Sequence, residues 1–279
     1  MTRSEFDGAP ILVLGANGKT GRRVAERLRA QGLSVRACAR STQPRFDWND
    51  RATWRAALDG VKRAYVTYQP DLAVPGALDT VSAFFDTALS AGAERIVLLS
   101  GRGEEEAQAA EHALQRSGAR WTILRCSWFM QNFSESFLLD PIREGTLALP
   151  AGDIKEPFVD AEDIADAAVA ALTQPGHENR LYELTGPRAI SFGEALECIA
   201  KASKRDLHFV PVAPEAFRAG LLDAGVSKPE TELILYLFTT VLDGRNERPA
   251  DGLRAALHRD ARSFEDYAAR VAASGLWNA

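Results

Sequence analysis

The stretch Ile11-Leu12-Val13-Leu14-Gly15-Ala16-Asn17-Gly18-Lys19-Thr20-Gly21 decides the fold. Four apolar residues lead into a G-x-x-G-x-x-G turn, and a segment with helical periodicity begins at about residue 18. Glycines permit a tight turn and a close approach of a pyrophosphate to the backbone, while a helix N-terminus offers N–H groups and a positive dipole end. Because a strand precedes the turn and a helix follows it, the stretch predicts a dinucleotide-binding unit.

The N-terminal half continues this alternation of strand and helix. Short apolar runs predict buried parallel strands at Ile11–Leu14, Val35–Ala39, Ala64–Thr67, Arg95–Leu99 and Trp121–Leu124. Amphipathic segments between them predict helices over 18–31, 76–91 and 105–117, followed by a helix over 160–174 and a strand over 181–184. This order is typical of an α/β fold with a doubly wound parallel sheet, the Rossmann arrangement.

The alternation loosens after about residue 126. We expect residues 1–190 to form an NAD(P)-binding Rossmann domain with a substrate-loop insertion at about 128–158. Residues 191–279 are expected to form a smaller, mostly helical lobe over the carboxyl edge of the sheet, where ligands of doubly wound folds bind. Its predicted elements are helices over 192–203, 214–223 and 229–243 and a short strand near 207–210.

Composition excludes several classes of function. The formal charge of −5 argues against nucleic acid, because phosphate binding needs a basic surface. The polar N-terminus resembles neither a signal peptide nor an anchor, and the apolar runs fall short of the roughly 20 residues of a membrane span, so a cytoplasmic protein with a small-molecule partner is expected. The spacing of Cys38, Cys126 and Cys198 predicts neither disulfides nor a metal site.

The residues after the second strand indicate which nicotinamide cofactor is used. Arg40 stands about twenty residues beyond the glycines, where an NAD-specific protein places Asp or Glu. A guanidinium suits a 2′-phosphate, and Ser41 is a second donor, so NADPH is predicted. Lys19 either assists or is a solvated helix charge. Asp47, after a predicted short third strand, is expected to meet the adenine amino group.

With these residues in place, the chain resembles the NmrA-like group of atypical short-chain dehydrogenases/reductases. Within that group it is most similar to the clavine reductases and to the flavin-free azoreductase and quinone-reductase-like proteins. The motifs that carry the resemblance are G-A-N-G-K-T-G at 15–21, R-F-D-W at 45–48, I-V-L-L-S at 96–100, S-G-A-R-W-T-I-L-R at 117–125, W-F-M-Q-N-F-S-E at 128–135, P-F-V-D-A-E-D-I-A at 157–165 and L-D-G-R-N at 242–246.

The resemblance implies an oxidoreductase, often a homodimer, with its cofactor across the carboxyl ends of the strands. The phosphate loop then consists of Gly15, Asn17, Gly18, Lys19, Thr20 and Gly21, and the 2′-phosphate site of Arg40 and Ser41. The implied neighbours of the ribose and nicotinamide are Thr67, Tyr68, Gln69, Ser100, Gly101, Cys126 and Trp128.

The chain lacks the usual carbonyl-reducing pair of this superfamily. Mainstream members use Tyr-x-x-x-Lys, starting roughly ten residues after the serine, to protonate the developing alkoxide. Here there is no tyrosine between Tyr68 and Tyr182 and no lysine between Lys62 and Lys155. The Gln108–His112 region fills the place, with Glu111 and His112 as its ionisable residues.

Two functions remain open. One is a reductase whose substrate accepts hydride with little proton help, such as a C=N, N=N or quinone compound. The other is an NADP(H)-binding sensor without turnover. A hydrolase or metalloenzyme is disfavoured, because the chain has neither G-x-S-x-G nor H-E-x-x-H.

Individual side chains have competing interpretations. The candidate catalytic residues are His112, Tyr68 and Ser100, and the candidate substrate pocket consists of Tyr68, Arg102, Trp128, Phe129, Asn132, Phe133 and Phe158. Core packing is the alternative for the aromatic rings, and solvent exposure is the alternative for His112 and Arg102. Glu104–Glu106 suit the first turn of a helix electrostatically and point about 100° apart, so at most Glu104 faces the cofactor.

Overall fold

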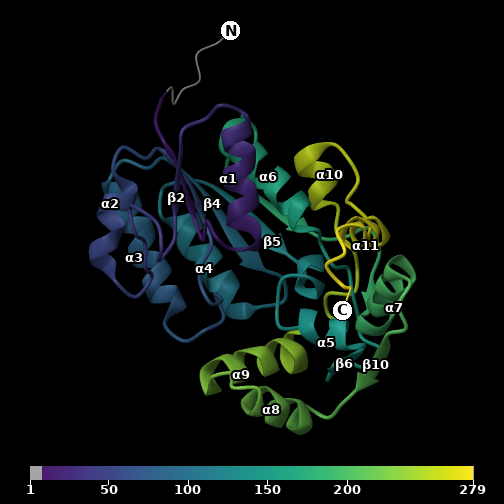
Figure 1. The fold of residues 1–279 in the computed structure, drawn as a ribbon. Coiled ribbons are helices and arrows are strands. Elements are labelled where there is room, and N and C mark those ends of the chain that lie inside the picture. Colours follow the sequence, from purple (N-terminus) through teal and green to yellow (C-terminus); the bar gives the residue numbers. More distant parts are fainter. Residues whose placement is uncertain (1–7, 279) are drawn as a thin grey trace. The chain divides into compact units, whose positions relative to one another are not determined.

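The computed structural model describes residues 8–278, whose contacts divide into two compact units (Figure 1). Unit 1 comprises the described residues up to Cys126, together with Ala161–Leu184 and Gly252–Arg259. Unit 2 comprises Ser127–Asp160, Thr185–Asp251 and the described residues from Asp260 onward. The chain therefore passes between the units five times. The domain boundary predicted at 190/191 stays a prediction.

Unit 1 contains the predicted parallel sheet. Over the described residues it has six strands in the order β2-β1-β3-β4-β5-β8, and every neighbouring pair is parallel. The strands are β1 (Ile11–Leu14), β2 (Val35–Cys38), β3 (Arg63–Val66), β4 (Arg95–Gly101), β5 (Arg120–Cys126) and β8 (Arg180–Leu184). The predicted doubly wound α/β fold is confirmed.

Helices cover both faces of this sheet because its central strands are apolar on both sides. Leu12, Leu14 and their neighbours on one face pack against α2 (Trp54–Leu58), α3 (Ala77–Ser90) and α4 (Glu105–Arg116), while a short 3₁₀ turn (Arg51–Thr53) precedes α2. The other face is covered by α1 (Lys19–Ala30) and α6 (Ala161–Thr173), which lie side by side in Figure 1. A last helix, α10 (Gly252–Leu257), contacts α6 and β8.

Ion pairs join α1 to α6. Arg23 Nε lies 2.6 Å from Glu162 Oε1, and Arg27 Nη2 lies 2.5 Å from Glu162 Oε2. Burial alone would raise the pKa of Glu162, but the bonds from Arg27 and Arg23 outweigh it and lower the pKa to about 2. One turn after Glu162, Asp166 lies 2.7 Å from Arg27 Nε through Oδ1 and 2.6 Å from Arg259 Nη2 through Oδ2. Helix α6 is thus fixed to both the first helix and the segment after α10.

Unit 2 is built on a cluster of aromatic rings. Phe133 packs on Phe158, Phe192 and Phe264, with ring centroids 5.3–5.5 Å apart, and these rings have almost no exposed surface. The strands pair as β6 (Thr146–Leu149) with β10 (His208–Pro211) and β7 (Lys155–Glu156) with β9 (Ile190–Ser191). The helices are α5 (Leu139–Glu144), α7 (Phe192–Ser203), α8 (Pro214–Asp223), α9 (Lys228–Tyr236) and α11 (Phe264–Ala273), with a 3₁₀ turn at Met130–Phe133 and a π turn at Leu237–Val241.

The predicted short third strand before Phe46 is wrong. Among the described residues no strand forms between β2 and β3, and Asp47 makes only an isolated bridge to Asp50. Instead the segment folds back on itself, because Phe46 N donates to Ala39 O at 3.0 Å and Thr42 Oγ1 donates to Pro44 O at 2.9 Å. Local bonds and burial of the Phe46 ring replace strand pairing here.

Candidate functional site

The phosphate-loop candidate joins β1 to α1, and its glycines are required by space. Gly15 has φ +62°, and a Cβ on it would lie 2.5 Å from Thr67 Cγ2. A Cβ on Gly21 would lie 2.2 Å from the carbonyl oxygen of Gly15, which is backbone and cannot swing away. The loop therefore packs against the start of α1 only because Gly21 lacks a side chain.

The start of α1 is electrostatically suited to an anion. Its N-cap residue is Gly18, which has no side chain to cap the helix, and the first turn carries no acidic side chain. No carboxylate in the first turn of α1 therefore offsets the positive end of the helix dipole. Together with the loop glycines, this is the arrangement that binds phosphate groups at helix N-termini.

The end of β2 is tied to this loop. Asn17 Nδ2 donates to Ser41 Oγ at 3.0 Å, which brings two predicted cofactor contacts together. Asn17, Arg40 and Ser41 are all exposed. An exposed guanidinium and hydroxyl beside a phosphate loop fit the 2′-phosphate of NADPH.

The turn at Asp47 uses that residue structurally. Arg45 Nη2 donates to Asp47 Oδ2 at 2.6 Å, and the backbone N–H of Asn49 donates to Asp47 Oδ1 at 3.0 Å. Trp54 Nε1 donates to the Asp47 carbonyl at 2.9 Å. Both carboxylate oxygens thus hold the turn, and contact with adenine stays a prediction.

The residues after β3 are anchored by tryptophan. Trp48 Nε1 donates to the Thr67 carbonyl at 3.2 Å, and the Tyr68 ring lies 4.9 Å from the Trp48 ring. Tyr68 is half-buried, whereas Gln69 is exposed. Thr67 Cγ2 occupies the space that a Cβ on Gly15 would need, so the end of β3 packs closely against the phosphate loop.

A set of bonded polar residues, here called the Ser100 cluster, joins the carboxyl ends of β4, β5 and β8 to α4. Two members are buried, Ser100 and Glu111, and three are half-buried, Arg102, Arg125 and Glu183. Ser100 Oγ donates to Glu111 Oε1 at 2.6 Å. Arg125 bonds Glu111 through Nε at 2.9 Å and through Nη2 at 2.5 Å. Glu111 is 1% exposed, so this carboxylate is buried with an arginine and a hydroxyl as partners.

The outer part of the Ser100 cluster involves Glu183. Arg125 Nη1 donates to Glu183 Oε1 at 3.1 Å, and Arg102 Nε lies 3.4 Å from Glu183 Oε2. The bond with Glu111 raises the pKa of Arg125, with burial opposing it. Sequence placed Arg102 in a substrate pocket or in solvent, and the structure places its side chain against Glu183, largely buried. Arg125 and Glu183 were not among the predicted site residues, because nothing in their spacing marks them.

Two carboxyl groups, Asp71 and Glu104, form what is here called the acid pair at the ends of β3 and β4. They share a side-chain hydrogen bond. Glu104 is 8% exposed, and burial followed by the Asp71 charge raises its pKa well above the usual range; the pKa of Asp71 is raised too, chiefly by burial. Both carboxyl groups are therefore harder to ionise than isolated ones, Glu104 more so than Asp71.

Gly101 makes room for the acid pair. A Cβ at this position would lie 2.1 Å from Glu104 Oε1. Glu105 and Glu106, by contrast, are exposed in the first turn of α4. Of the three consecutive glutamates, Glu104 alone turns inward, as the angular argument allowed. Asp71 was not predicted, because its loop shows no periodic pattern.

The remaining predicted residues of unit 1 have contrasting environments. His112 is exposed on α4, one position after the buried Glu111. Cys126 is buried, and its Sγ approaches the Leu124 carbonyl at 3.5 Å; burial raises the pKa of the Cys126 thiol. A catalytic role for His112 and a cofactor contact for Cys126 stay predictions.

The predicted pocket residues of unit 2 belong mostly to its aromatic core. Trp128 is half-buried and packs on Phe238 at 4.8 Å and on Phe192 at 5.5 Å. Phe133 and Phe158 lie inside the cluster described above. Phe129 and Asn132 are half-buried, and the Asn132 backbone N–H donates to the Phe129 carbonyl at 3.0 Å. Contact of these side chains with a substrate stays a prediction.

Residues 8–278 contain neither a metal-binding cluster nor a membrane-spanning helix. No group of three or more His, Cys, Asp or Glu side chains is placed to hold a metal ion. None of the helices in that range combines the length and the apolar character needed to cross a membrane.

Comparison with known proteins assigns the segment that begins at the phosphate loop to a family. Residues 15–175 match the model of a family described as NAD(P)H-binding. The matched range starts at the first glycine of the phosphate loop and extends through α6. It therefore includes the phosphate loop, the acid pair and the Ser100 cluster apart from Glu183.

Three relatives match nearly the full chain. Prestalk A differentiation protein A of Dictyostelium discoideum is 30% identical, over 92% of this chain and 91% of its own. Agroclavine dehydrogenase of Claviceps fusiformis is 32% identical, over 92% and 95%. NAD(P)H azoreductase of Xenophilus azovorans is 28% identical, over 95% and 98%.

A solved structure shows the same fold. Triphenylmethane reductase of Citrobacter sp., crystallised with NADP(H), superposes with a TM-score of 0.74 at 22% sequence identity. The match covers 94% of this chain and 99% of that one.

Proposed function

Since the chain belongs to this NAD(P)H-binding family, within the NmrA-like atypical short-chain dehydrogenases/reductases, we propose that it is a flavin-free, NADPH-dependent reductase of C=N, N=N or quinone substrates. The family is one of NAD(P)H-dependent oxidoreductases. The observation that carries the finer proposal is the bond from Ser100 to Glu111, in a chain without the Tyr-Lys pair.

The residues of unit 1 fit the cofactor. Gly15, Gly18 and Gly21 leave space for a pyrophosphate at the start of α1, and Arg40 with Ser41 would hold a 2′-phosphate. When bound, NADPH supplies the hydride. These loop residues would fix the cofactor's position along the carboxyl edge of the sheet, where Thr67 and Gly101 also lie.

The Ser100 hydroxyl is not available to donate to a substrate oxygen in this arrangement. Its proton is directed to Glu111, which Arg125 holds in place. A ketone needs a proton as its alkoxide develops, and the chain offers no tyrosine for that task on α4. Substrates that are already electrophilic, such as an iminium ion, need orientation rather than a proton at carbon.

For quinone and azo substrates we propose that the acid pair supplies the proton. Hydride addition leaves negative charge on an oxygen or nitrogen; Glu104 would donate its proton there and regain one from solvent, completing a two-electron reduction. Asp71 would keep Glu104 protonated and oriented. His112 is the rival donor, on the exposed face of α4.

The pH dependence of turnover separates these two donors. A carboxyl with a raised pKa is protonated below that pKa and loses its proton as pH rises through it, so the quinone rate should fall on the alkaline side. In Glu104→Gln most of the quinone-reduction rate should be lost, and the remaining rate should no longer fall at alkaline pH. In His112→Gln the rate and its fall at alkaline pH should both be retained. Reduction of a preformed iminium should be nearly unchanged in Glu104→Gln, because no proton is needed at carbon. An unaltered alkaline limb in Glu104→Gln would exclude this donor.

A substrate panel tests the proposed class. We expect NADPH oxidation with naphthoquinones, cyclic iminium ions or azo dyes, and none with simple aliphatic ketones, measured as loss of NADPH absorbance. Two relatives support these classes by their names, an azoreductase and a clavine-type dehydrogenase. Ketone reduction at a comparable rate would contradict the argument from Ser100.

A second candidate function is an NADP(H)-binding sensor. It is favoured by the 30% identical relative named as a differentiation protein rather than as an enzyme. NADPH binding without turnover on any member of the panel would support it.

We also propose, from the resemblance alone, a cytoplasmic homodimer. Sedimentation at the mass of one chain would contradict the dimer.

A further inference from the structure

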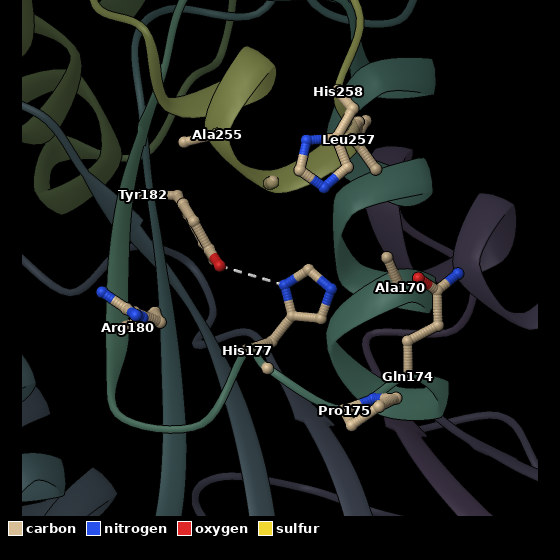
Figure 2. A pocket seen from close by; sticks show the side chains of 11 residues that line it. Ala170, Gln174, Pro175, His177, Arg180, Tyr182, Ala255, Leu257 and His258 are labelled. Atoms are coloured by element: carbon tan, nitrogen blue, oxygen red, sulfur yellow. Dashed lines mark hydrogen bonds between the residues drawn. The ribbon is translucent and has the colours of Figure 1, made fainter.

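A cavity of about 490 Å³ lies in unit 1 beside the edge strand β8, and Figure 2 shows the side chains that line it. Its walls come from the end of α6, the loop leading into β8, the first half of β8 and the end of α10. The loop precedes β8, and Asn179 N donates to Trp121 O at the start of β5 at 2.6 Å. The cavity thus lies at the amino ends of the strands, whereas the phosphate loop and the Ser100 cluster lie at the carboxyl ends.

His177 is the central polar group of this cavity. Its side chain is 7% exposed, and Nδ1 lies 3.0 Å from the Tyr182 hydroxyl. Within residues 8–278, Nε2 has no hydrogen-bond partner from the protein. Figure 2 shows the imidazole facing the space between Tyr182, His258 and Gln174. A nine-tenths-buried ring with one nitrogen fixed and the other directed into a cavity is arranged to bind a ligand.

The loop that carries His177 is rigidly built. Thr122 Oγ1 donates to the His177 carbonyl at 2.7 Å. Arg95, which is largely buried, donates to the carbonyls of Ala171 at 3.1 Å and Gln174 at 3.0 Å and pairs with Glu178. This arginine also neutralises the negative end of α6, which would otherwise repel an anion at the cavity.

The charge of the lining favours an anion. Arg180, His177 and His258 line the cavity, and no Asp or Glu is among its lining residues, although the chain as a whole carries −5. The nearby Glu178 carboxylate is occupied by Arg95 and by the Gly176 N–H at 2.8 Å. Burial lowers the pKa of His177, so its neutral ring recognises a ligand by hydrogen bonding, while Arg180 supplies positive charge at the rim.

The rest of the lining is apolar, from alanine side chains together with Pro175 and Leu257. A volume near 490 Å³ falls within the usual range of small-molecule sites. We propose that this cavity is a second ligand site, separate from the cofactor, for a small monocarboxylate with a compact aromatic or aliphatic body. Its carboxylate would accept from His177 Nε2, and its body would pack against Leu257.

The four histidines of the chain provide a direct test. His177 and His258 line the cavity, whereas His112 and His208 lie elsewhere, so protein with isotope-labelled histidine gives two reporting and two control imidazole signals. Benzoate is the probe, benzamide its neutral isostere, and inorganic phosphate the anion without an apolar body. We expect benzoate to shift the His177 and His258 signals alone, with NADPH present or absent. Benzamide and phosphate should need at least about ten-fold higher concentrations, a difference of about 1.4 kcal/mol.

Variants make the assignment specific. In His177→Phe, which keeps the ring volume, benzoate binding read from the His258 signal should weaken at least about ten-fold. Tyr182→Phe should also weaken it, because the phenol no longer fixes the imidazole, and this variant serves if His177→Phe fails to fold. The control His208→Gln should bind benzoate like the unaltered protein. The proposal is overturned if benzoate shifts none or all four of the signals, if phosphate binds as well as benzoate, if NADPH competes, or if the cavity variants bind normally.

Discussion

Around the phosphate loop, at the ends of β1 and β2, the polar side chains are exposed to solvent, whereas those of the Ser100 cluster are buried or half-buried and joined by ion pairs. Asn17, Arg40 and Ser41 surround the phosphate loop with exposed donors. In the Ser100 cluster, the hydroxyl and both arginines have carboxylate partners. Both regions lie at the carboxyl edge of one sheet. The first leaves donors open to a ligand, and the second has its polar groups paired within the protein.

The largest expected effect is on the stability of the Ser100 cluster. Glu111→Ala should lower the free energy of unfolding by about 3–5 kcal/mol, because it removes the buried carboxylate that bonds both Ser100 and Arg125 and leaves the half-buried guanidinium with Glu183. Denaturant unfolding measures this. Glu105→Ala, on the exposed face of the same helix, should stay within about 0.5 kcal/mol. An equal decrease in the free energy of unfolding in the two variants would show that the Ser100 cluster does not stabilise the fold.

Next in size is an effect on binding at the phosphate loop. Gly21→Ala places a Cβ 2.2 Å from the Gly15 carbonyl oxygen and should weaken NADPH binding about 100-fold or more, which is about 2.7 kcal/mol. Fluorescence titration of NADPH provides the measurement. Gly220→Ala makes the same chemical change in α8, where nothing lies within 4 Å, and should leave binding unaltered. Unchanged affinity in Gly21→Ala would mean that the cofactor does not use this loop.

The exposed donors at the end of β2 should set the choice of cofactor. In Arg40→Met the preference for NADPH over NADH, taken as a ratio of dissociation constants, should fall about ten-fold, or about 1.4 kcal/mol. NADH affinity itself should change little. Arg29→Met removes an equally exposed arginine from the far end of α1 and controls for net charge. A loss of affinity equal for both cofactors would contradict a 2′-phosphate contact.

The smallest effect is expected at Ser100. Ser100→Ala removes one donor to Glu111 while Arg125 remains, so stability should fall by about 1 kcal/mol. The rate with quinones should change by only a few-fold, because the hydroxyl is proposed to position Glu111 rather than to donate to substrate. Steady-state kinetics at saturating NADPH decides this. A loss comparable to that in Glu104→Gln would make Ser100 a catalytic residue.

The strands of the parallel sheet and the helix α1 in unit 1 could be predicted from the sequence for a physical reason. Buried parallel strands such as Ile11–Leu14 are continuous apolar runs, and α1 is marked by glycines and by its apolar face, so both are local signals. The error before Phe46 arose because short-range hydrogen bonds from Thr42 and Phe46 decide that segment, and they leave no periodic pattern. The two-residue strands β7 and β9 are too short to show alternation.

Which side chains of the site are buried and which contact one another was less predictable than the strands and helices that carry them. Glu111 and His112 are adjacent in sequence, yet one is buried and the other exposed, because their side chains leave the helix about 100° apart. Which of them faces the sheet depends on how α4 packs. Asp71 meets Glu104 only because the ends of β3 and β4 are neighbours. Pairing across strands of this kind is invisible in a single sequence.

The five passages of the chain between its units have a consequence for dissecting the protein. A cut at 190/191 would remove Gly252–Arg259 from unit 1, and with it the Arg259 bonds to Asp163 and Asp166. It would equally separate Phe133 and Phe158 from Phe192 and Phe264 in the core of unit 2. Neither fragment would carry a complete core, so limited proteolysis at one site should yield nicked, associated chains rather than two stable halves.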